Sequence, residues 1–450
     1  MSAKAPRTGG ADVDLALDAL PSVVLRLGLP AVSSALLLTA FISLDAAWVG
    51  HFVGGAGLAA VSTSIFWIWV IVSLAEMVSV GLTAVAARRH GERRDEEAAR
   101  AVGDALLFTF ALGVATACAG LAFLPRLFAL MNTPAKVTML GMRYLGTYLA
   151  GSPLIFGYFV VDAAFRAAGN TRLPFIMLVC ATAVAAVLDP LLITGWGPFP
   201  ALGVQGAALA TLCVRGSLCV VGIVMLRRRG LVSFGAPDWN RIGTIVRVGL
   251  PTAATGVIFS LIYVVMTRTT TQFGTPALAA LGLGHRVESW MYMIGVGFGS
   301  AAAAIVGQNL GAGRPDRAAR AGWLTLAATG VPGIIACCAL WLVPDALAGL
   351  FSADPAVVAE AARYLRAAAL SQLFVSGETV LEGALGGAGW TLPPMITSTA
   401  ITAARVPLAA WAATQWGTSG IWWVISLTAI ARAIAMMALW GSGGWRRARV

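Results

Sequence analysis

Three acidic residues, Asp45, Asp162 and Asp189, lie inside long apolar stretches of the sequence. An ionisable group inside a bilayer costs about 2.5–3.5 kcal/mol on insertion scales, so such a residue usually serves a function. A carboxylate in such a place can take up and release a proton, or it can ligate a small cation. We therefore expect these residues to couple an ion to the work of the protein.

Two of these acids have a proline on the same apolar run. Asp189 has the most apolar flanks and precedes Pro190, which frees a backbone carbonyl one turn earlier for a cation or water. Asp45 follows Pro30, so its run carries a hinge toward one end and a titratable group toward the other. Asp45 also lies close to Gly50 and is consistent with an interfacial residue that reaches water.

The remaining acids have competing structural interpretations. Asp162 precedes Arg166 by one helical turn, a spacing that is equally typical of an ion pair within a helix. Glu382 occupies the position of Asp162 in a second half of the sequence, and Glu288 follows Arg286 near an expected helix start. We regard Glu288 and Glu382 as secondary candidates, and a structural ion pair with Arg286 is at least as consistent with Glu288.

The acids lie in a sequence that consists of two similar halves, an internal repeat. Shifted by 220 residues, Leu58-Ala59-Ala60 falls on Leu278-Ala279-Ala280, and near the start Gly28-Leu29-Pro30 recurs as Gly249-Leu250-Pro251. In a membrane protein such a duplication usually builds two bundles around a central site. Asp45 and Asp189 have no acidic counterpart in the second half, so we expect the first half to carry ion coupling.

Composition predicts an all-α integral membrane protein. The 450 residues are 58% hydrophobic and 11% charged, with a mean hydropathy of +0.83, and the apolar runs reach the roughly 20 residues that span a bilayer. Twelve spans are expected at roughly 24–50, 57–84, 102–124, 140–165, 173–195, 203–226, 246–272, 277–306, 321–343, 362–386, 392–413 and 420–440. Because each half has an even number of spans, the two six-helix repeats are parallel.

The formal net charge of +11 comes mostly from arginines that gather in alternate loops. This is the positive-inside pattern, and it predicts that both termini are cytoplasmic. No basic face with interleaved aromatic residues is present, so we expect no nucleic-acid partner. The predicted units are a cytoplasmic tail (1–21), an N-terminal bundle (22–230), a linker (231–245), a C-terminal bundle (246–441) and a basic tail (442–450).

Several strings in this order resemble the multidrug and toxic compound extrusion (MATE) transporters over about residues 22–440. They are the Gly-Leu-Pro that opens each half, Leu44–Gly50, Leu58–Val61, Arg166–Arg172, Asp189-Pro190, Gly203–Thr211 and Val306–Gly313. The acids of the first half resemble the DinF-like branch of that family. In that branch an ion-coupling site maps here onto Asp45, Asp189 and Thr211.

The sequence departs from the branch at two positions. The helix 4 asparagine of the branch appears here as Asp162, and its helix 5 asparagine is Ala185. Losing an amide oxygen disfavours Na+, which needs several oxygens at once, although a Na+ site at Asp45, Asp189 and Thr211 stays an alternative. Protonation needs only a carboxylate whose surroundings disfavour its charge. We therefore favour H+ coupling through Asp45, Asp162 and Asp189.

The resemblance implies a secondary antiporter that exports cationic or amphiphilic organic compounds in exchange for H+, or Na+, by alternating access. We expect a monomer in the cell membrane, with no cofactor. The alternative is a lipid-linked precursor flippase of the same wider superfamily, which Arg405 and Arg432 in the second half would serve. An enzyme is not expected, because the histidines lie near helix ends without a nucleophile or metal constellation.

Overall fold

The computed structural model describes residues 15–129, 131, 134–196, 200–352 and 354–448, and this part of the chain consists of helices joined by turns, without strands. The expected all-α fold is confirmed. The predicted tails at 1–21 and 442–450 lie partly outside the described residues. The helices of the first half are α1 (Leu20–Phe52), α2 (Gly55–Gly91), α3 (Asp95–Ala129), α4 (Ala135–Ala150), α5 (Ser152–Ala167), α6 (Arg172–Thr194) and α7 (Val204–Arg228).

The second half repeats this order with more breaks. Its helices are α8 (Trp239–Thr271), α9 (Thr275–Gly311), α10 (Pro315–Ala328), α11 (Gly330–Leu342), α12 (Pro344–Gly349), α13 (Pro355–Ala369), α14 (Gln372–Gly387) and α15 (Leu392–Ser442), followed by the 3-10 helix η1 (Gly444–Arg447). α8 begins inside the segment expected as a linker, because the Asp238 side chain accepts hydrogen bonds from the backbone N–H groups of Asn240 and Arg241.

Twelve spans follow from these helices. In the described chain nine helical segments are long and apolar enough to cross a bilayer, with α10 and α11 counted as one, and α4 with α5 form a tenth that bends by 53°. α15 is two helices joined at Gly417, whose φ of 61° is not helical. α13 and α14 divide at Ser371, the position of Gly151 between α4 and α5 in the repeat, and together they complete the set.

The helices run beyond the apolar stretches that predicted them. α2 extends to Gly91, and its last turn contains Arg88, Arg89 and His90. Cations there interact favourably with the carbonyl end of the helix dipole, so the basic loop continues the helix rather than ending it.

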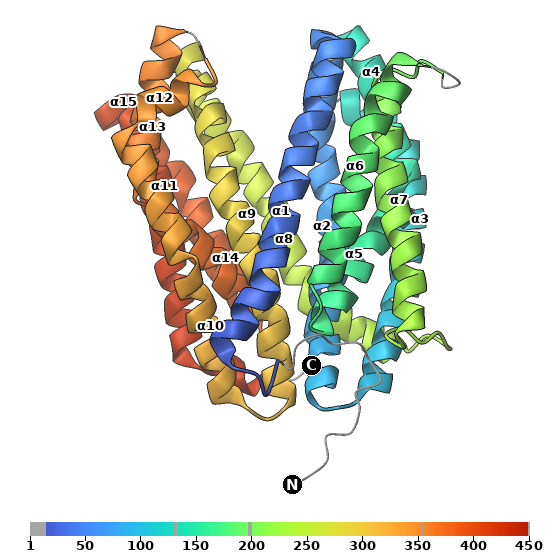
Figure 1. The fold of residues 1–450 in the computed structure, drawn as a ribbon. Coiled ribbons are helices and arrows are strands. Elements are labelled where there is room, and N and C mark those ends of the chain that lie inside the picture. Colours follow the sequence, from blue (N-terminus) through green and yellow to red (C-terminus); the bar gives the residue numbers. More distant parts are fainter. Residues whose placement is uncertain (1–14, 130, 132–133, 197–199, 353, 449–450) are drawn as a thin grey trace.

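Two bundles diverge toward one end of the molecule and meet at the other (Figure 1). The start of α1 and the end of α15 both lie at the end where the bundles meet. α1 packs against α9 of the second half, and α8 packs against α2 of the first. The first helix of each repeat therefore contacts the second helix of the other, which is the reciprocal arrangement expected of two equivalent repeats.

Reciprocal glycine contacts hold the bundles together at that end. A side chain added to Gly91 would stand 2.0 Å from the Gln308 carbonyl oxygen, and one added to Gly311 would stand 2.0 Å from that of Arg88. Gln308 also crosses the interface, where its Nε2 donates to the Ala167 carbonyl at 2.6 Å. Backbones this close leave no room for a Cβ atom, which is why both repeats carry glycine here.

Candidate functional site

Asp45 lies in the outer half of α1, the half farther from the end where the bundles meet. Its side chain is 5% exposed, and its Oδ1 atom has no hydrogen-bond partner. The Tyr144 hydroxyl of α4 lies within hydrogen-bonding reach of the carboxylate. Asp45 is therefore enclosed by protein, and the interpretation of this residue as an interfacial group in water is wrong.

Asp189 lies on α6 and is fully buried, and neither of its carboxylate oxygens has a hydrogen-bond partner. Pro190 follows it within the continuous helix, so the Ala186 carbonyl one turn earlier lacks its usual donor. The Asp45 and Asp189 carboxyls lie within electrostatic range of each other. We call these two residues the acid pair.

The structure does not bring Asp162 into the acid pair. Asp162 forms an ion pair with Arg166 on the next turn of α5. Arg166 also donates from Nη2 to the Ser79 hydroxyl of α2 at 3.3 Å. The i,i+4 spacing thus forms the intrahelical pair that it equally favoured, and the expected cluster of three acids is reduced to two.

Thr211 and Ala185 lie where the resemblance placed additional ion ligands. Thr211 is buried on α7, but among the described residues its hydroxyl makes no hydrogen bond to either carboxylate of the acid pair. Ala185 is fully buried on α6 and has no oxygen in its side chain. The Tyr144 side chain of the α4–α5 span reaches Asp45, although no pattern in the sequence indicated this residue.

Pro30 lies inside α1, which continues through it as one helix. Its carbonyl accepts a hydrogen bond from the Ser34 hydroxyl at 3.0 Å. The role of Pro30 as a hinge stays a prediction.

The second bundle contains a buried ion pair between Arg432 and Glu378. Arg432 of α15 donates from Nε to Glu378 of α14 at 2.6 Å and from Nη1 to the Thr402 hydroxyl at 3.2 Å. Arg405 donates from Nε to the Thr428 hydroxyl at 2.8 Å. Both arginines that favoured the flippase alternative thus have partners inside the bundle.

Glu288 on α9 is part of a separate buried network. It accepts hydrogen bonds from the Tyr364 hydroxyl at 2.8 Å and from Gln372 Nε2 at 3.4 Å. The Arg286–Glu288 ion pair that the sequence favoured is absent from the described residues, where Arg286 is exposed. Charged neighbours in sequence do not meet here because residues two apart project from different faces of a helix.

Acidic groups from both bundles meet between them. Glu76 near the middle of α2 is exposed, and it lies within electrostatic range of Glu382 on α14 and of Tyr292 on α9. Exposed charges at mid-membrane depth normally face the interior of a transporter, because lipid disfavours them. The secondary candidate Glu382 therefore has a partner from the other repeat, and Glu76 was not selected by sequence although it is an acid within a predicted span.

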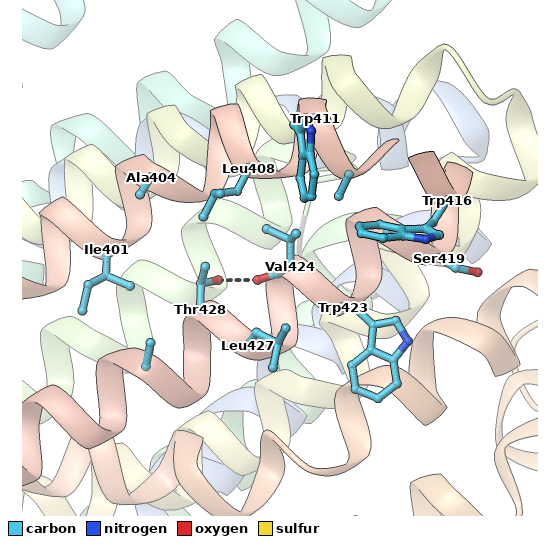
Figure 2. Close-up of a pocket in the computed structure, with 13 residues that line it drawn as sticks. Ile401, Ala404, Leu408, Trp411, Trp416, Ser419, Trp423, Val424, Leu427 and Thr428 are labelled. Atoms are coloured by element: carbon cyan, nitrogen blue, oxygen red, sulfur yellow. Dashed lines mark hydrogen bonds between the residues drawn. The ribbon is translucent and has the colours of Figure 1, made fainter. Parts of the chain in front are cut away.

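A groove of about 840 Å³ lies elsewhere, along the two halves of α15. Its wall is apolar and carries three tryptophans, Trp411, Trp416 and Trp423, all more than 40% exposed (Figure 2). Exposed tryptophans on an apolar surface are typical of a face toward the bilayer. The groove contains no acid and is separate from the acid pair.

Comparison with known proteins places this geometry in a family. The MatE family model matches residues 30–191 and 251–411, one match in each repeat. A Thermotoga maritima protein described as a probable multidrug resistance protein NorM is 30% identical, over 95% of this chain and 93% of its own. A Shewanella oneidensis protein described as an FAD transporter is 30% identical over 75% of each chain.

Solved structures share the fold. An outward-facing multidrug resistance MATE family transporter of the MOP superfamily superposes with a TM-score of 0.89 at 21% identity, covering 97% of this chain and 98% of its own. The Vibrio cholerae MATE transporter VcmN in its bent form gives 0.86 at 19% identity, over 94% and 97% of the two chains. Members of this family are transporters and not enzymes. With its duplicated six-helix bundles and a family match in each, the chain belongs to the MATE family of membrane transporters.

Proposed function

We propose that this protein is a multidrug efflux transporter that exchanges cationic or amphiphilic organic compounds for protons. The observation that carries the proposal is the acid pair, in which a fully buried Asp189 has no partner for either oxygen and Asp45 lies nearby. An unpaired carboxylate in a protein interior is far more stable protonated than charged. The acid pair can therefore bind a proton, and its charge changes when that proton leaves.

The ligand set supports protons over Na+. A Na+ ion would need several oxygens around the acid pair, but the Ala185 side chain has none, and among the described residues the Thr211 hydroxyl makes no hydrogen bond to either carboxylate. Asp162 is held by Arg166 and adds no third carboxylate. The assignment to the DinF-like branch stays part of this proposal.

The substrate side of the proposal rests on the acids between the bundles. Glu76 and Glu382 place two carboxyl groups between the bundles at mid-depth, where they would attract an organic cation. Tyr292 beside them is 44% exposed and offers an aromatic face. The Shewanella relative is described as an FAD transporter, so cations are not the only substrates named among the relatives.

Alternating access follows from the way the bundles meet. They touch at the end that carries the arginines of the α2–α3 and α9–α10 turns and diverge at the other. The positive-inside rule makes that end cytoplasmic, so both termini face the cytoplasm of a cell with this protein in its plasma membrane. The conformation is then open to the outside, and we expect a monomer to complete the cycle.

The flippase alternative needs several free cationic groups lining the central cavity to hold pyrophosphate. Arg405 and Arg432 are engaged by Thr428 and Glu378 inside the second bundle. The exposed charges at the interface include Glu76, which would repel a pyrophosphate.

Transport in proteoliposomes tests the proposal, with a pH gradient and a Na+ gradient imposed separately. In vesicles with an acidic interior, an added cationic dye such as rhodamine 6G should enter and make the interior more alkaline, with or without Na+. Transport that requires Na+ at zero pH gradient would contradict proton coupling, and restoring the amide with Ala185→Asn should then strengthen the Na+ dependence.

A further inference from the structure

Arg215 is a buried cation in the middle of the first bundle. It lies near the centre of α7, about 16–20 Å from either end of the helix by the rise per residue, and its side chain is 8% exposed. An arginine side chain is too short to reach the lipid headgroups from that depth. Its charge must therefore be balanced by something within the bundle.

Among the described residues no protein group forms an ion pair with Arg215. The Nε and Nη1 atoms of Arg215 are buried without a hydrogen-bond partner, and no acid of the described chain forms an ion pair with it. The guanidinium carbon lies 5.7 Å from the centre of the Phe159 ring, which leaves the charged edge of the group available. Removing one partner from a buried charge is strongly unfavourable, so the absence of a partner needs a reason.

The second repeat shows what is missing. Arg432 occupies the equivalent position and lies over Phe259 at 5.8 Å, as Arg215 lies over Phe159. Arg432, however, has the Glu378 carboxylate and the Thr402 hydroxyl as partners.

In the first repeat both partners of the equivalent arginine have been replaced. The position of Glu378 is taken by Tyr158, and the position of Thr402 by Ala185. Arg215 has an aromatic neighbour from another helix, Phe159 of α5 where Arg432 has Phe259 of α8, and it lacks both the carboxylate and the hydroxyl partner. The first bundle therefore lacks, at the Arg215 guanidinium, the carboxylate that Glu378 supplies to Arg432 in the second bundle.

The same region contains the acid pair. Tyr144 of α4 lies within electrostatic range of Asp45, Asp189 and Arg215. Tyr158 of α5 lies within range of Arg215 as well. A cationic group and a carboxylate pair thus lie around Tyr144, which is a suitable environment for a molecule that carries both charges.

We propose that Arg215 binds the carboxylate or phosphate group of a zwitterionic or anionic substrate within the first bundle. This inference rests on the proposed function, because it names a class of substrate for the same transporter. The guanidinium presents a fork of N–H donors that matches two oxygens of one anionic group. The anion would supply to Arg215 the negative charge that Glu378 supplies to Arg432.

Two dyes with one ring system test the proposal. Rhodamine 19 has a free carboxylate, and rhodamine 6G is its ethyl ester, so their affinities differ through that group alone. Binding of each dye to the purified full chain in detergent is followed by fluorescence anisotropy, and the readout is the ratio of the two dissociation constants. Arg215→Gln should reduce the preference for the free acid about ten- to a hundredfold, the range for a hydrogen-bonded charge.

A gain-of-partner variant makes the test independent of damage to the fold. Tyr158→Glu recreates the carboxylate of the second repeat, so it should occupy Arg215, raise the melting temperature and remove the preference for the free acid. Arg432→Gln is the matched control: it should lower the melting temperature, because Glu378 loses its partner, and keep the ratio of the two affinities.

The outcomes separate this inference from the proposed function. An unchanged affinity ratio in Arg215→Gln, or a full preference for the free acid in Tyr158→Glu, would overturn the role of Arg215. Because binding needs no gradient, a failure of proton coupling in proteoliposomes leaves this readout intact. A wild-type protein that binds neither dye contradicts both.

Discussion

Replacing the two interface glycines should shift the protein from its present conformation to the opposite one. In Gly91→Ala with Gly311→Ala, each new Cβ atom would stand 2.0 Å from a carbonyl oxygen of the other bundle, where 3.4 Å is an ordinary contact. The helices α2 and α9 must therefore separate by about 1.4 Å. The Gln308–Ala167 hydrogen bond of 2.6 Å crosses the same point and would be strained or lost.

These contacts set the size of the effect. Overpacking in a tight contact costs about 1–3 kcal/mol, and the lost hydrogen bond costs about 0.5–1.5 kcal/mol more. The penalty applies only to the state in which the bundles meet at this end, since separating them removes the clash. The population ratio of the two states should change by a factor of about ten to a thousand, because 1.4 kcal/mol corresponds to a factor of ten.

Spin labels provide the assay. Arg100 at the start of α3 and Arg320 on α10 are exposed, equivalent in the repeat and located at the end where the bundles meet. Pulsed electron paramagnetic resonance between labels at these positions should give one short distance in the otherwise unaltered protein. The double glycine variant should add a longer one.

Two glycines on the same helices provide the control. Gly55 on α2 and Gly282 on α9 have open space where a Cβ atom would stand, so alanine there has no steric effect on either conformation. A distance distribution that is the same in the interface variant and in this control would refute the reasoning. A change in both pairs would equally refute it, because helix propensity alone would then explain the shift.

Three further results are expected. Asp189→Asn should abolish export driven by a pH gradient while keeping the wild-type elution and melting temperature, because a buried neutral amide replaces a carboxyl that had no partner; export at the wild-type rate would exclude Asp189 from coupling. Glu378→Gln should lower the free energy of unfolding by about 3–5 kcal/mol in a detergent melt, since it leaves the buried Arg432 without its carboxylate, and a melt within error of the wild type would contradict this. Single cysteines at Arg93 and Arg314, in a cysteine-free background, should react with an impermeant thiol reagent only from the cytoplasmic side; labelling from outside intact cells would reverse the topology.

The fold was accessible from the sequence because its signals are long and redundant. Apolar runs and a repeat at a fixed shift predicted twelve spans, and the structure has helices in each predicted region. In the described chain nine segments, or ten with the bent α4–α5 pair, are long and apolar enough to cross a bilayer. The helix ends were less predictable. Arg88 to His90 extend α2 because cations are favourable at the carbonyl end of a helix, and Asp238 caps α8 before its apolar stretch begins. Both helices are therefore longer than the apolar stretches from which they were predicted.

The site was accessible only in part. Asp45 and Asp189 come together because each lies on a helix with no competing cation one turn away. Asp162 does not join them, because it forms an ion pair with Arg166 on the next turn. Tyr144 was not selected, because an aromatic residue in an apolar run carries no signal that separates packing from hydrogen bonding.

Charges are distributed unequally between the two repeats, and this difference assigns them different roles. In the second bundle Arg432 and Glu378 neutralise each other, so no proton or ligand is needed to keep that bundle intact. In the first bundle Asp45, Asp189 and Arg215 all have buried polar atoms without partners. Such groups lower stability unless a proton or an anion binds to them. Binding in the first bundle therefore changes the energy of the protein by much more than binding in the second, and conformational change should be driven from there.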